Sequence, residues 1–481
     1  MNIAVAEKNA MTIYLKSINS TQDVTICMVR ENGRDMLLII GDPAGFDAKR
    51  LDANDEMYLA PLNHASAKKL RELFPFTAPK KVLTSNRTFG VGDRLGLATP
   101  GHLRVFKKYD ALPVLAQQSI RELNLTGRGY QQVLDCATFA VFREGFRRGF
   151  GADGDHIKTI EEIDYAVSCG YTMLTLDCSK YIRNDVSSMT KEQIMAESKP
   201  SSELEETYIG KDVEIGDGIV ISFTHEELFR AELIYRGAIN YVKLIYDMYI
   251  KDHSQMDFEV SIDETDTPTT PLQHYFVANE LKKLGVTFAT MAPRFCGEFQ
   301  KGIDYLGDLE QFEREFIVHS AIAEHFGYKL SIHSGSDKFA VYPTIGKYSN
   351  GRFHVKTSGT SWLEAMRLVA QKDPALYREI HKFALGVFSE AKKFYHVTTD
   401  LNKIPDVDLL RDEELPELLD KNDSRQLIHI TYGSILGEKN PDGSYRFKDR
   451  LYRVLEEHAD GYAELLEKHI GKHLELLYKE L

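Results

Sequence analysis

Two histidines stand among acidic and hydroxyl residues where short apolar runs end, and this combination could bind a metal ion. His156 follows Asp155 in GADGDHIKT, and His333 lies in LSIHSGSDK. Borderline and hard divalent cations are held by mixed shells of imidazole and carboxylate groups. A single histidine on a strand is more often a hydrogen-bonded core residue. Two of them, with carboxylates at several run ends, favour the metal site.

A cluster of carboxylates in MDFEVSIDET could transfer protons. Asp263 and Glu264 follow the apolar part of this run, Asp266 comes shortly after, and Glu259 lies within it. Clustered carboxylates raise one another's pKa values, which suits a general acid or base. The alternative is a solvated turn that an aspartate side chain caps.

Two further segments carry groups that could hold an anionic substrate. In PRFCGEFQKGIDYLGD, Arg294 could clamp a carboxylate through paired hydrogen bonds and Glu298 could ligate a cation, although a surface pairing explains both almost as well. In FHVKTSGTS, Lys356, Thr357 and Ser358 precede the expected start of a helix. A cation, hydroxyls and backbone N–H groups at a helix N-terminus form an anion site. Ordinary capping needs only Ser361, so the additional polar groups favour the anion site.

The common nucleotide-binding patterns do not occur in the sequence. TFGVGDRLGLATPGH has Gly90, Gly92 and Gly96, which is not the GxGxxG spacing, and there is no GxxxxGK[ST]. A dinucleotide-binding fingerprint is therefore not supported. Asp93 and Arg94 in this segment belong either to a loop at the site or to a tight structural turn.

The elements that must position these groups are strand–helix–strand units. Residues 150–179 contain one such unit, in which Thr159 and Glu162 form a capping box at the start of the helix. Units of this kind build parallel sheets, and in α/β barrels the C-terminal ends of the strands meet at one face, where the chemistry is placed. The candidates at the two strand ends of this unit are His156, Lys158 and Asp177.

Eight strands are expected from residue 81 onward, the number that closes a (β/α)8 barrel. The segments between them carry helix signals, such as the cap formed by Thr270 and Pro271 after the fifth strand and the pair Ser361 and Glu364 after the eighth. The fold class is therefore α/β, a TIM-like barrel. The expected strands are 81–84, 113–118, 155–158, 171–177, 256–262, 286–291, 329–333 and 353–357.

The sequence predicts additions on both sides of the barrel. Residues 1–80 form a β-rich N-terminal cap, in which an Asn-Gly pair at 32–33 marks a hairpin turn. Residues 81–360 form the catalytic barrel, with an insertion at about 179–225 whose length is typical of lids and binding loops. Residues 361–481 form a helical C-terminal region.

Composition excludes several classes of protein. The chain has 481 residues and a formal net charge of −13 without a long basic run, so nucleic acid is not an expected partner. No apolar run approaches about eighteen residues and the N-terminus lacks the order of a secretory signal, so we expect no membrane association and a cytoplasmic location. Five scattered cysteines without a CxxC pair favour reduced thiols. Nothing in the sequence indicates an oligomeric state.

In these segments the chain resembles the tagaturonate epimerase family, bacterial enzymes that interconvert the keto-uronic acids D-tagaturonate and D-fructuronate. The resemblance covers nearly the whole chain. It is carried jointly by FGVGDRLGLATPGH, GADGDHIKT, YTMLTLD, VSIDETDTPTTP, APRFCGEFQKGIDYLGD, LSIHSGSDK and FHVKTSGTS.

The resemblance implies an epimerase of hexuronate breakdown that needs a divalent metal cation and no nicotinamide. It implies Asp155 as the general base, Glu264 as the general acid, and a metal held by His156, His333 and Glu298. Asp177, Lys158 and His354 are alternative positions for these roles. The residues expected to bind the small sugar-acid substrate are Lys158, Asp177, Arg294, Lys356, Thr357 and Ser358.

The chemistry of the implied reaction sets a further constraint. The inverted carbon is β to the ketone, so simple enolisation does not acidify its C–H bond. Retro-aldol cleavage and readdition to the other face of the aldehyde would explain the inversion without a redox cofactor, with the cation as a Lewis acid. Two alternatives stay open: a class II-type metal-dependent aldolase acting on a sugar acid, and a non-catalytic sugar-acid-binding protein.

Overall fold

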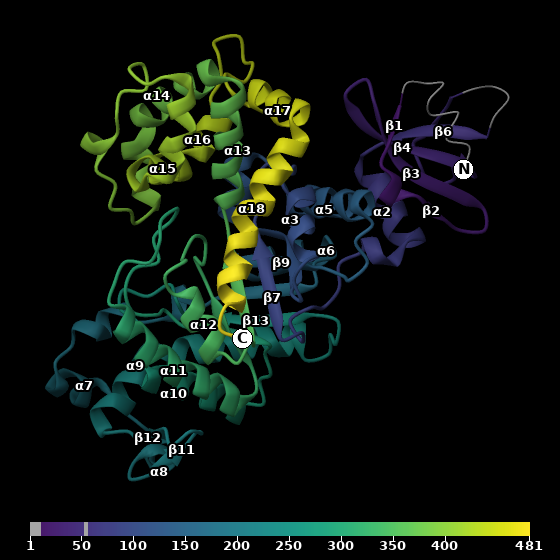
Figure 1. The fold of residues 1–481 in the computed structure, drawn as a ribbon. Helices are drawn as coiled ribbons and strands as arrows, with labels where there is room; N and C mark the ends of the chain where they lie inside the picture. Colours follow the sequence, from purple (N-terminus) through teal and green to yellow (C-terminus); the bar gives the residue numbers. More distant parts are fainter. Residues whose placement is uncertain (1–10, 52–55) are drawn as a thin grey trace.

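A closed barrel of parallel strands forms the centre of the protein. The computed structural model describes residues 11–51 and 56–481, and Figure 1 shows the barrel with an N-terminal sheet and a helical C-terminal region beside it. The strand order around the barrel is β10-β13-β14-β15-β16-β7-β8-β9. The predicted TIM-like fold is confirmed. The barrel strands are β7 (Arg87–Val91), β8 (Leu112–Ser119), β9 (Gly151–Ile157), β10 (Met173–Asp177), β13 (Asp257–Ser261), β14 (Thr290–Ala292), β15 (Lys329–Ile332) and β16 (Phe353–Thr357).

The barrel strands are covered on both faces, and β13, β15 and β16 largely alternate apolar with polar residues along their length. Every residue of β10, β13, β15 and β16 is buried. The apolar side chains pack outward against the helices, while several polar ones point into the barrel. The helices between the strands are α3 (Thr99–Phe106), α4 (Ile120–Thr126), α5 (Tyr130–Glu144), α6 (Ile160–Ser168), α9 (His225–Ile245), α10 (Pro271–Lys283), α11 (Leu309–Phe326) and α12 (Tyr342–Tyr348).

The first barrel strand is not the one that the sequence predicts. The expected strand over 81–84 is wrong, because the first barrel strand is β7, which pairs with β8 and β16. The N–H groups of Val82 and Leu83 instead donate to Oδ2 of Asp257, over 2.7 and 2.8 Å. Asp257 is the first residue of β13, so residues 82–83 close the N-terminal end of the barrel. Their apolar side chains are buried there, which explains their strand-like pattern.

An antiparallel sheet precedes the barrel. Its central hairpin pairs β3 (Val24–Glu31) with β4 (Arg34–Gly41). Asn32 and Gly33 have φ values of 48° and 78°, the left-handed conformations that such a turn requires, so the predicted hairpin is confirmed. Residues 1–10 and 52–55 of the predicted cap lie outside the described residues. The other elements are β1 (Thr12–Ile13), η1 (Leu15–Ser17), β2 (Asn19–Ser20), β5 (Lys49–Arg50), β6 (Met57–Pro61), α2 (His64–Leu73) and η2 (Pro75–Thr77).

Between β10 and β13 the chain makes a long excursion over the outside of the barrel. It ends in α9, which starts at a capping box of Thr224 and Glu227 and continues as a π-helical turn over Tyr246–Ile250. The beginning of the excursion lies on α9, where Tyr181 stacks on Tyr241 with ring centroids 4.1 Å apart. The short elements before α9 are η3 (Ser179–Tyr181), η4 (Asn184–Ser188), α7 (Lys191–Glu197), α8 (Ser202–Tyr208), β11 (Val213–Glu214) and β12 (Val220–Ile221).

Two of the three predicted helix caps are confirmed. Thr159 accepts the N–H of Glu162 in a reciprocal capping box, and Thr270 does the same with Gln273. The pair Ser361 and Glu364 is wrong as a cap. Helix α13 (Thr360–Lys372) begins two residues earlier than this cap predicts, because its N-cap is Gly359 at φ 84°, and no side chain caps it. The Glu364 carboxylate instead contacts Arg367 at 3.0 Å and His469 at 3.5 Å.

The C-terminal helices form a second hydrophobic core, and one long helix is among the elements that attach them to the barrel. In Figure 1, α18 (Ala459–Tyr478) runs from the helical region down along the barrel. Close packing fixes this contact, since a Cβ on Gly101 of α3 would lie 2.8 Å from Leu466. Among the described residues, no helix is both long and apolar enough to cross a membrane. The other elements are α14 (Pro374–Ala391), η6 (Lys392–Phe394), η7 (Leu401–Lys403), η8 (Asp412–Asp420), α15 (Asn422–Ile430), α16 (Tyr432–Gly437) and α17 (Lys448–Glu457).

Candidate active site

The C-terminal ends of the barrel strands surround a cavity of about 490 Å³. This volume lies in the range of small-molecule sites, about 300–1,000 Å³. Most of the residues singled out in the sequence line it. They come from β9, β10, β16 and the loops after β13 and β15, as expected for a TIM-like barrel. The predicted residues that line the cavity are Asp155, His156, Lys158, Asp177, Glu264, His333, Lys356, Thr357 and Ser358.

Arg294 and Glu298 lie elsewhere, in a neighbouring cavity of about 640 Å³. The Arg294 guanidinium donates to the carbonyl of Thr265, and a Glu298 carboxylate oxygen lies 3.4 Å from Nε2 of His396. The two cavities share Glu264 and His333 among their lining residues. Among the described residues, Glu298 is not part of the group of ligand atoms around His156 and His333 that could hold one ion, so its place as a metal ligand stays a prediction.

The third member of the histidine group is Asp263. One ligand atom from each of His156, Asp263 and His333 lies within 4.8 Å of the others, a spacing that suits one cation. The two imidazole rings are 4.8 Å apart between centroids. His156 has φ 53°, a left-handed conformation that is uncommon for a residue other than glycine and that occurs at functional sites.

Second contacts orient both rings and leave a nitrogen of each for a cation. Nε2 of His333 is 2.8 Å from Oε1 of Glu259. Its Nδ1 is buried without a hydrogen-bond partner, although Oδ1 of Asp263 lies 3.2 Å away. Nδ1 of His156 is 2.8 Å from Oδ1 of Asp155, which leaves its Nε2. Carboxylates that orient histidine ligands in this way are typical of metal sites, so the donor set fits a divalent cation.

Without a cation, the carboxylates favour protonated histidines. Burial alone would lower the pKa of His333, but Asp263 and Glu259 raise it to about 10. Burial alone would also lower the pKa of His156, but Asp155 raises that pKa above the ordinary value. Burial would raise the pKa of Asp263, but His333 and His156 hold it below its usual range. The predicted mutual raising of carboxyl pKa values therefore does not apply to Asp263, because two imidazoles face it.

Lys356 lies at the centre of a buried charge cluster inside the barrel. Its ammonium is 2.7 Å from Oδ2 of Asp153, 2.5 Å from Oδ1 of Asp155 and 3.2 Å from Oε1 of Glu259. Thr175 accepts a further hydrogen bond from it over 2.6 Å. Lys356 is only 4% exposed, and its charge is already balanced by these carboxylates. Its predicted role as the clamp for a substrate carboxylate does not fit this placement.

The carboxylates around Lys356 differ in their pKa values. Burial alone would lower the pKa of Lys356, but the three carboxylates raise it well above the ordinary value. Burial raises the pKa of Asp153 to about 6, against the opposing effect of Lys356. Burial would also raise the pKa of Asp155, but Lys356 and His156 hold it far below its usual range. Asp155 is therefore an ionised carboxylate at the cavity wall, and Asp153 is the cluster member nearest to protonation.

A second lysine–carboxylate pair lies on the same wall. Lys158 is 2.9 Å from Oδ2 of Asp177, and the carboxylate is fully enclosed while the ammonium reaches the cavity. His354, an alternative position for a catalytic role, is buried inside the barrel with Nδ1 2.9 Å from Oγ1 of Thr88. It does not line the cavity. Lys158 and Asp177 can meet a substrate there, whereas His354 supports the strands.

Sequence reasoning assigned no role to several residues of this site. Asp153 and Thr175 are buried among the barrel strands; Thr175 is a polar residue inside the apolar run of β10, while Asp153 lies in β9 beside Asp155 and His156. Glu259 was named only as a member of the carboxylate cluster, without its contact to His333. Lys301 lies within a quoted segment, yet its loop has no strand or helix pattern that fixes a direction. Arg121 lies in α4 and comes from a segment that carries no motif. Arg94 was left open between a site loop and a structural turn, and the structure places it in the cavity wall.

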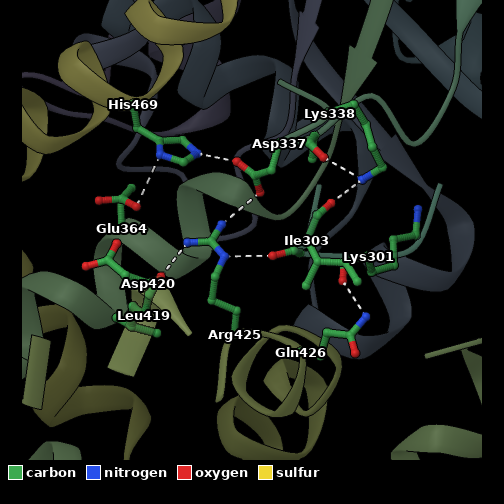
Figure 2. A network of polar contacts seen from close by, with 12 residues as sticks. Lys301, Ile303, Asp337, Lys338, Glu364, Leu419, Asp420, Arg425, Gln426 and His469 are labelled. Atoms are coloured by element: carbon green, nitrogen blue, oxygen red, sulfur yellow. Dashed lines mark hydrogen bonds and ion pairs between the residues drawn. The ribbon is translucent and has the colours of Figure 1, made fainter. Parts of the chain in front are cut away.

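A second acid–histidine group lies outside this cavity and has a structural explanation. Figure 2 shows Asp337 between Arg425 of α15 and His469 of α18. Its carboxylate oxygens are 2.8 Å from Nη2 of Arg425 and 2.6 Å from Nε2 of His469. Nε2 of His473 accepts the N–H of Asp337 over 3.1 Å. These atoms are already engaged in hydrogen bonds within the protein. The group therefore has a structural role, in which it joins the loop after β15 to the C-terminal helices.

Comparison with known proteins gives matches along almost the entire chain. A family model described as tagaturonate epimerase matches residues 14–477. The tagaturonate/fructuronate epimerase of Thermotoga maritima is 41% identical over 473 residues, which covers 97% of this chain and 96% of the relative. Two crystal structures of the fructuronate-tagaturonate epimerase from Cohnella laeviribosi, one native and one glycerol-complexed, are 47% identical with a TM-score of 0.95, and 99% of each chain is covered.

Proposed function

Because the chain belongs to the tagaturonate epimerase family and is an epimerase of the isomerase class, we propose that it interconverts D-tagaturonate and D-fructuronate with the help of a divalent cation. Relatives that cover almost the full chain carry this activity in their names. The observation that carries the proposal within this chain is the convergence of His156, Asp263 and His333 at the mouth of the barrel.

We assign the binding of the cation to His156, Asp263 and His333. The unpartnered Nδ1 of His333 and the oriented ring of His156 support this assignment. Glu259 and Asp155 hold the two rings in place and are not needed as ligands themselves. When bound, a divalent cation supplies Lewis-acid polarisation of a ketone oxygen.

The reaction that best fits the substrates is retro-aldol cleavage followed by readdition. Counting from the hydroxymethyl end, the ketone is C2 and the inverted carbon is C4. A base removes the proton of the C4 hydroxyl, and the C3–C4 bond breaks. Its electron pair passes into an enediolate over C2 and C3, and C4 becomes an aldehyde. After the aldehyde turns its other face, C3 attacks it again, and an acid returns a proton to the C4 oxygen.

Asp155 and Glu264 are the groups that we propose for these proton transfers. Asp155 is ionised because Lys356 and His156 hold its pKa low despite burial, so it is in the form that accepts a proton. Glu264 is exposed on the cavity wall directly after Asp263, where it meets both substrate and solvent. Lys158 reaches the cavity beside Asp177 and can donate a hydrogen bond to a substrate hydroxyl.

The proposal is tested by following D-tagaturonate with NMR in the presence of purified protein. Cation-loaded protein should form D-fructuronate until an equilibrium is reached. Chelated protein should be inactive and should recover when a divalent cation is returned. Accumulation of free three-carbon fragments would identify an aldolase instead. Binding of the sugar acid without turnover by the loaded protein would identify a sugar-acid-binding protein.

A further inference from the structure

Three cations other than Lys356 and Lys158 line the main cavity. Arg94 follows β7, Arg121 lies in α4, and Lys301 lies in the loop between β14 and α11. Arg121 and Lys301 also line the neighbouring cavity, so they stand where the two cavities meet. Residues from three separate elements thus bring positive charge to one side of the mouth.

Lys301 is held by a hydroxyl group rather than by a carboxylate. Its ammonium donates to Oγ of Ser334 over 3.0 Å. No carboxylate of the described part of the chain lies within ion-pair distance of it, whereas Lys158 and Lys356 have such partners at 2.9 and 2.5 Å. Lys301 is partly buried. A partly buried ammonium without a counter-charge is costly, because it has lost water and gained no anion.

The two arginines also have unused capacity. Nε and Nη2 of Arg94 donate to Oε1 of Glu122 over 3.0 and 2.8 Å, but its Nη1 is buried and has no partner. Arg121 lies over the ring of Tyr395 at 5.0 Å. Within residues 11–51 and 56–481, no carboxylate forms an ion pair with Arg121. A guanidinium with free N–H groups is well suited to a carboxylate.

These cations lie close enough to affect one another. Burial lowers the pKa of Lys301, and Arg121 and Arg94 lower it further, against the opposing effect of Glu122 and Glu264. The uncapped N-terminus of α13 adds to the positive potential here. A Cβ on its N-cap residue Gly359 would lie 2.7 Å from Nη1 of Arg94. An anion is the ligand that such a surrounding attracts.

We propose that Lys301, together with Arg94 and Arg121, binds the carboxylate of the sugar-acid substrate. This inference rests on the proposed function. Ser334, which holds the Lys301 ammonium, directly follows His333, so the anion subsite adjoins the residues assigned to the cation. In the substrate, the carboxylate is two bonds from the carbon that inverts. An anion subsite of this kind would make the cavity selective for sugar acids. Lys301 then has the role, binding of the substrate carboxylate, that the sequence suggested for Lys356.

Ligand binding tests the proposal independently of turnover. The probes are D-mannonate, an open-chain sugar acid without a ketone, and D-mannitol, its neutral counterpart. Neither can undergo retro-aldol cleavage. Calorimetric titration of cation-loaded wild type should show a clear preference for the acid. Lys301→Met should weaken D-mannonate binding about 10- to 150-fold, the effect of losing a hydrogen bond to a charged group. D-mannitol binding should stay unchanged.

Three further variants keep the result interpretable. Lys301→Arg retains the charge and should keep most of the preference for the acid. Arg121→Met should weaken D-mannonate binding and spare D-mannitol. Lys372→Met changes an exposed lysine at the end of α13 and should behave as wild type. Equal binding of both probes by wild type, or an unchanged preference in Lys301→Met with normal thermal unfolding, would overturn the proposal.

The outcome separates this inference from the proposed function. If wild type does not epimerise D-tagaturonate but prefers D-mannonate, and Lys301→Met abolishes that preference, the anion subsite stands and the proposed reaction fails. If wild type epimerises D-tagaturonate and Lys301→Met leaves the KM for it and the binding of D-mannonate unchanged, the reaction stands and the subsite assignment fails.

Discussion

Substitution of Lys356 by methionine should destabilise the whole barrel rather than weaken substrate binding selectively. Methionine fills a similar volume but removes the ammonium that Asp153, Asp155 and Glu259 share. Breaking a buried ion pair by removing one partner costs about 3–5 kcal/mol, because the remaining charge is left without compensation. The folding equilibrium constant should therefore fall by at least about a hundredfold.

The loss should depend on pH in a defined direction. The pKa of Asp153 is already raised to about 6 by burial, with Lys356 opposing the rise. Without Lys356 it rises further. A carboxyl whose pKa is raised in the folded state does not destabilise the fold below its unfolded pKa of 3.8, where it is protonated in both states. As pH increases through the folded pKa, the carboxyl ionises and the free energy of unfolding falls. The deficit of Lys356→Met should be smallest near pH 5 and larger at pH 8.

Urea unfolding followed by fluorescence measures this effect, since Trp362 is the single tryptophan and is buried in the core of the C-terminal helices, where its indole N–H donates to the carbonyl of Ile428 over 2.9 Å. Lys329→Met is the matched control, because Lys329 is a buried barrel lysine that donates to neutral oxygens of Ser85 and Thr88. The Lys329→Met variant leaves no carboxylate without its ion-pair partner, so it should lose less stability than Lys356→Met. Near-normal stability of Lys356→Met, together with a KM increase confined to the sugar acid, would show that Lys356 is a carboxylate clamp and not the centre of a stabilising charge cluster.

Three further predictions concern the barrel floor, the histidine group and the proposed acid. Asp257→Ala removes the acceptor of the Val82 and Leu83 N–H groups and should cost about 3 kcal/mol, while Asp257→Asn should recover part of it; equal urea midpoints for wild type and the alanine variant would contradict this. Because the folded pKa of His333 is about 10, cation-free protein should keep its full melting temperature near pH 6.5 and lose stability as pH rises to 10, and a pH-independent melting temperature would contradict this. Glu264→Gln should lower kcat by about 10²–10⁴-fold with unchanged cation stoichiometry; near-normal turnover refutes the acid role, and a lost cation would make Glu264 a ligand.

The residues at the C-terminal strand ends could be predicted to lie together, because parallel strands all run in the same direction. The capping box at Thr159 and the apolar run that ends on Asp177 define one unit, and a parallel barrel brings such ends to one face. His156 and His333 were therefore found together from the sequence. The alternation within a strand also held the information for Glu259, since an acidic residue inside an apolar run can only point into the barrel.

The placement of the remaining site residues could not be predicted, because it depends on the conformation of loops and on which charged groups pair inside the barrel. Asp263 and Glu298 are both acidic residues after strands, and only the folded loop places Asp263 beside the histidines. Lys356 has the residue type of an anion clamp, but its neighbours across the barrel neutralise it. Val82 and Leu83 have the pattern of a strand because burial at the barrel floor needs the same side chains.

The retro-aldol route is tested most directly by epimerisation of D-tagaturonate in D2O by cation-loaded protein, read by NMR at the inverted carbon. Retro-aldol cleavage never breaks the C4–H bond, so we expect D-fructuronate with protium at C4, and no product from chelated protein or from His333→Ala. Deuterium at C4 would show that a proton is removed from that carbon, and this result would contradict the retro-aldol route on which the roles of Asp155 and Glu264 rest.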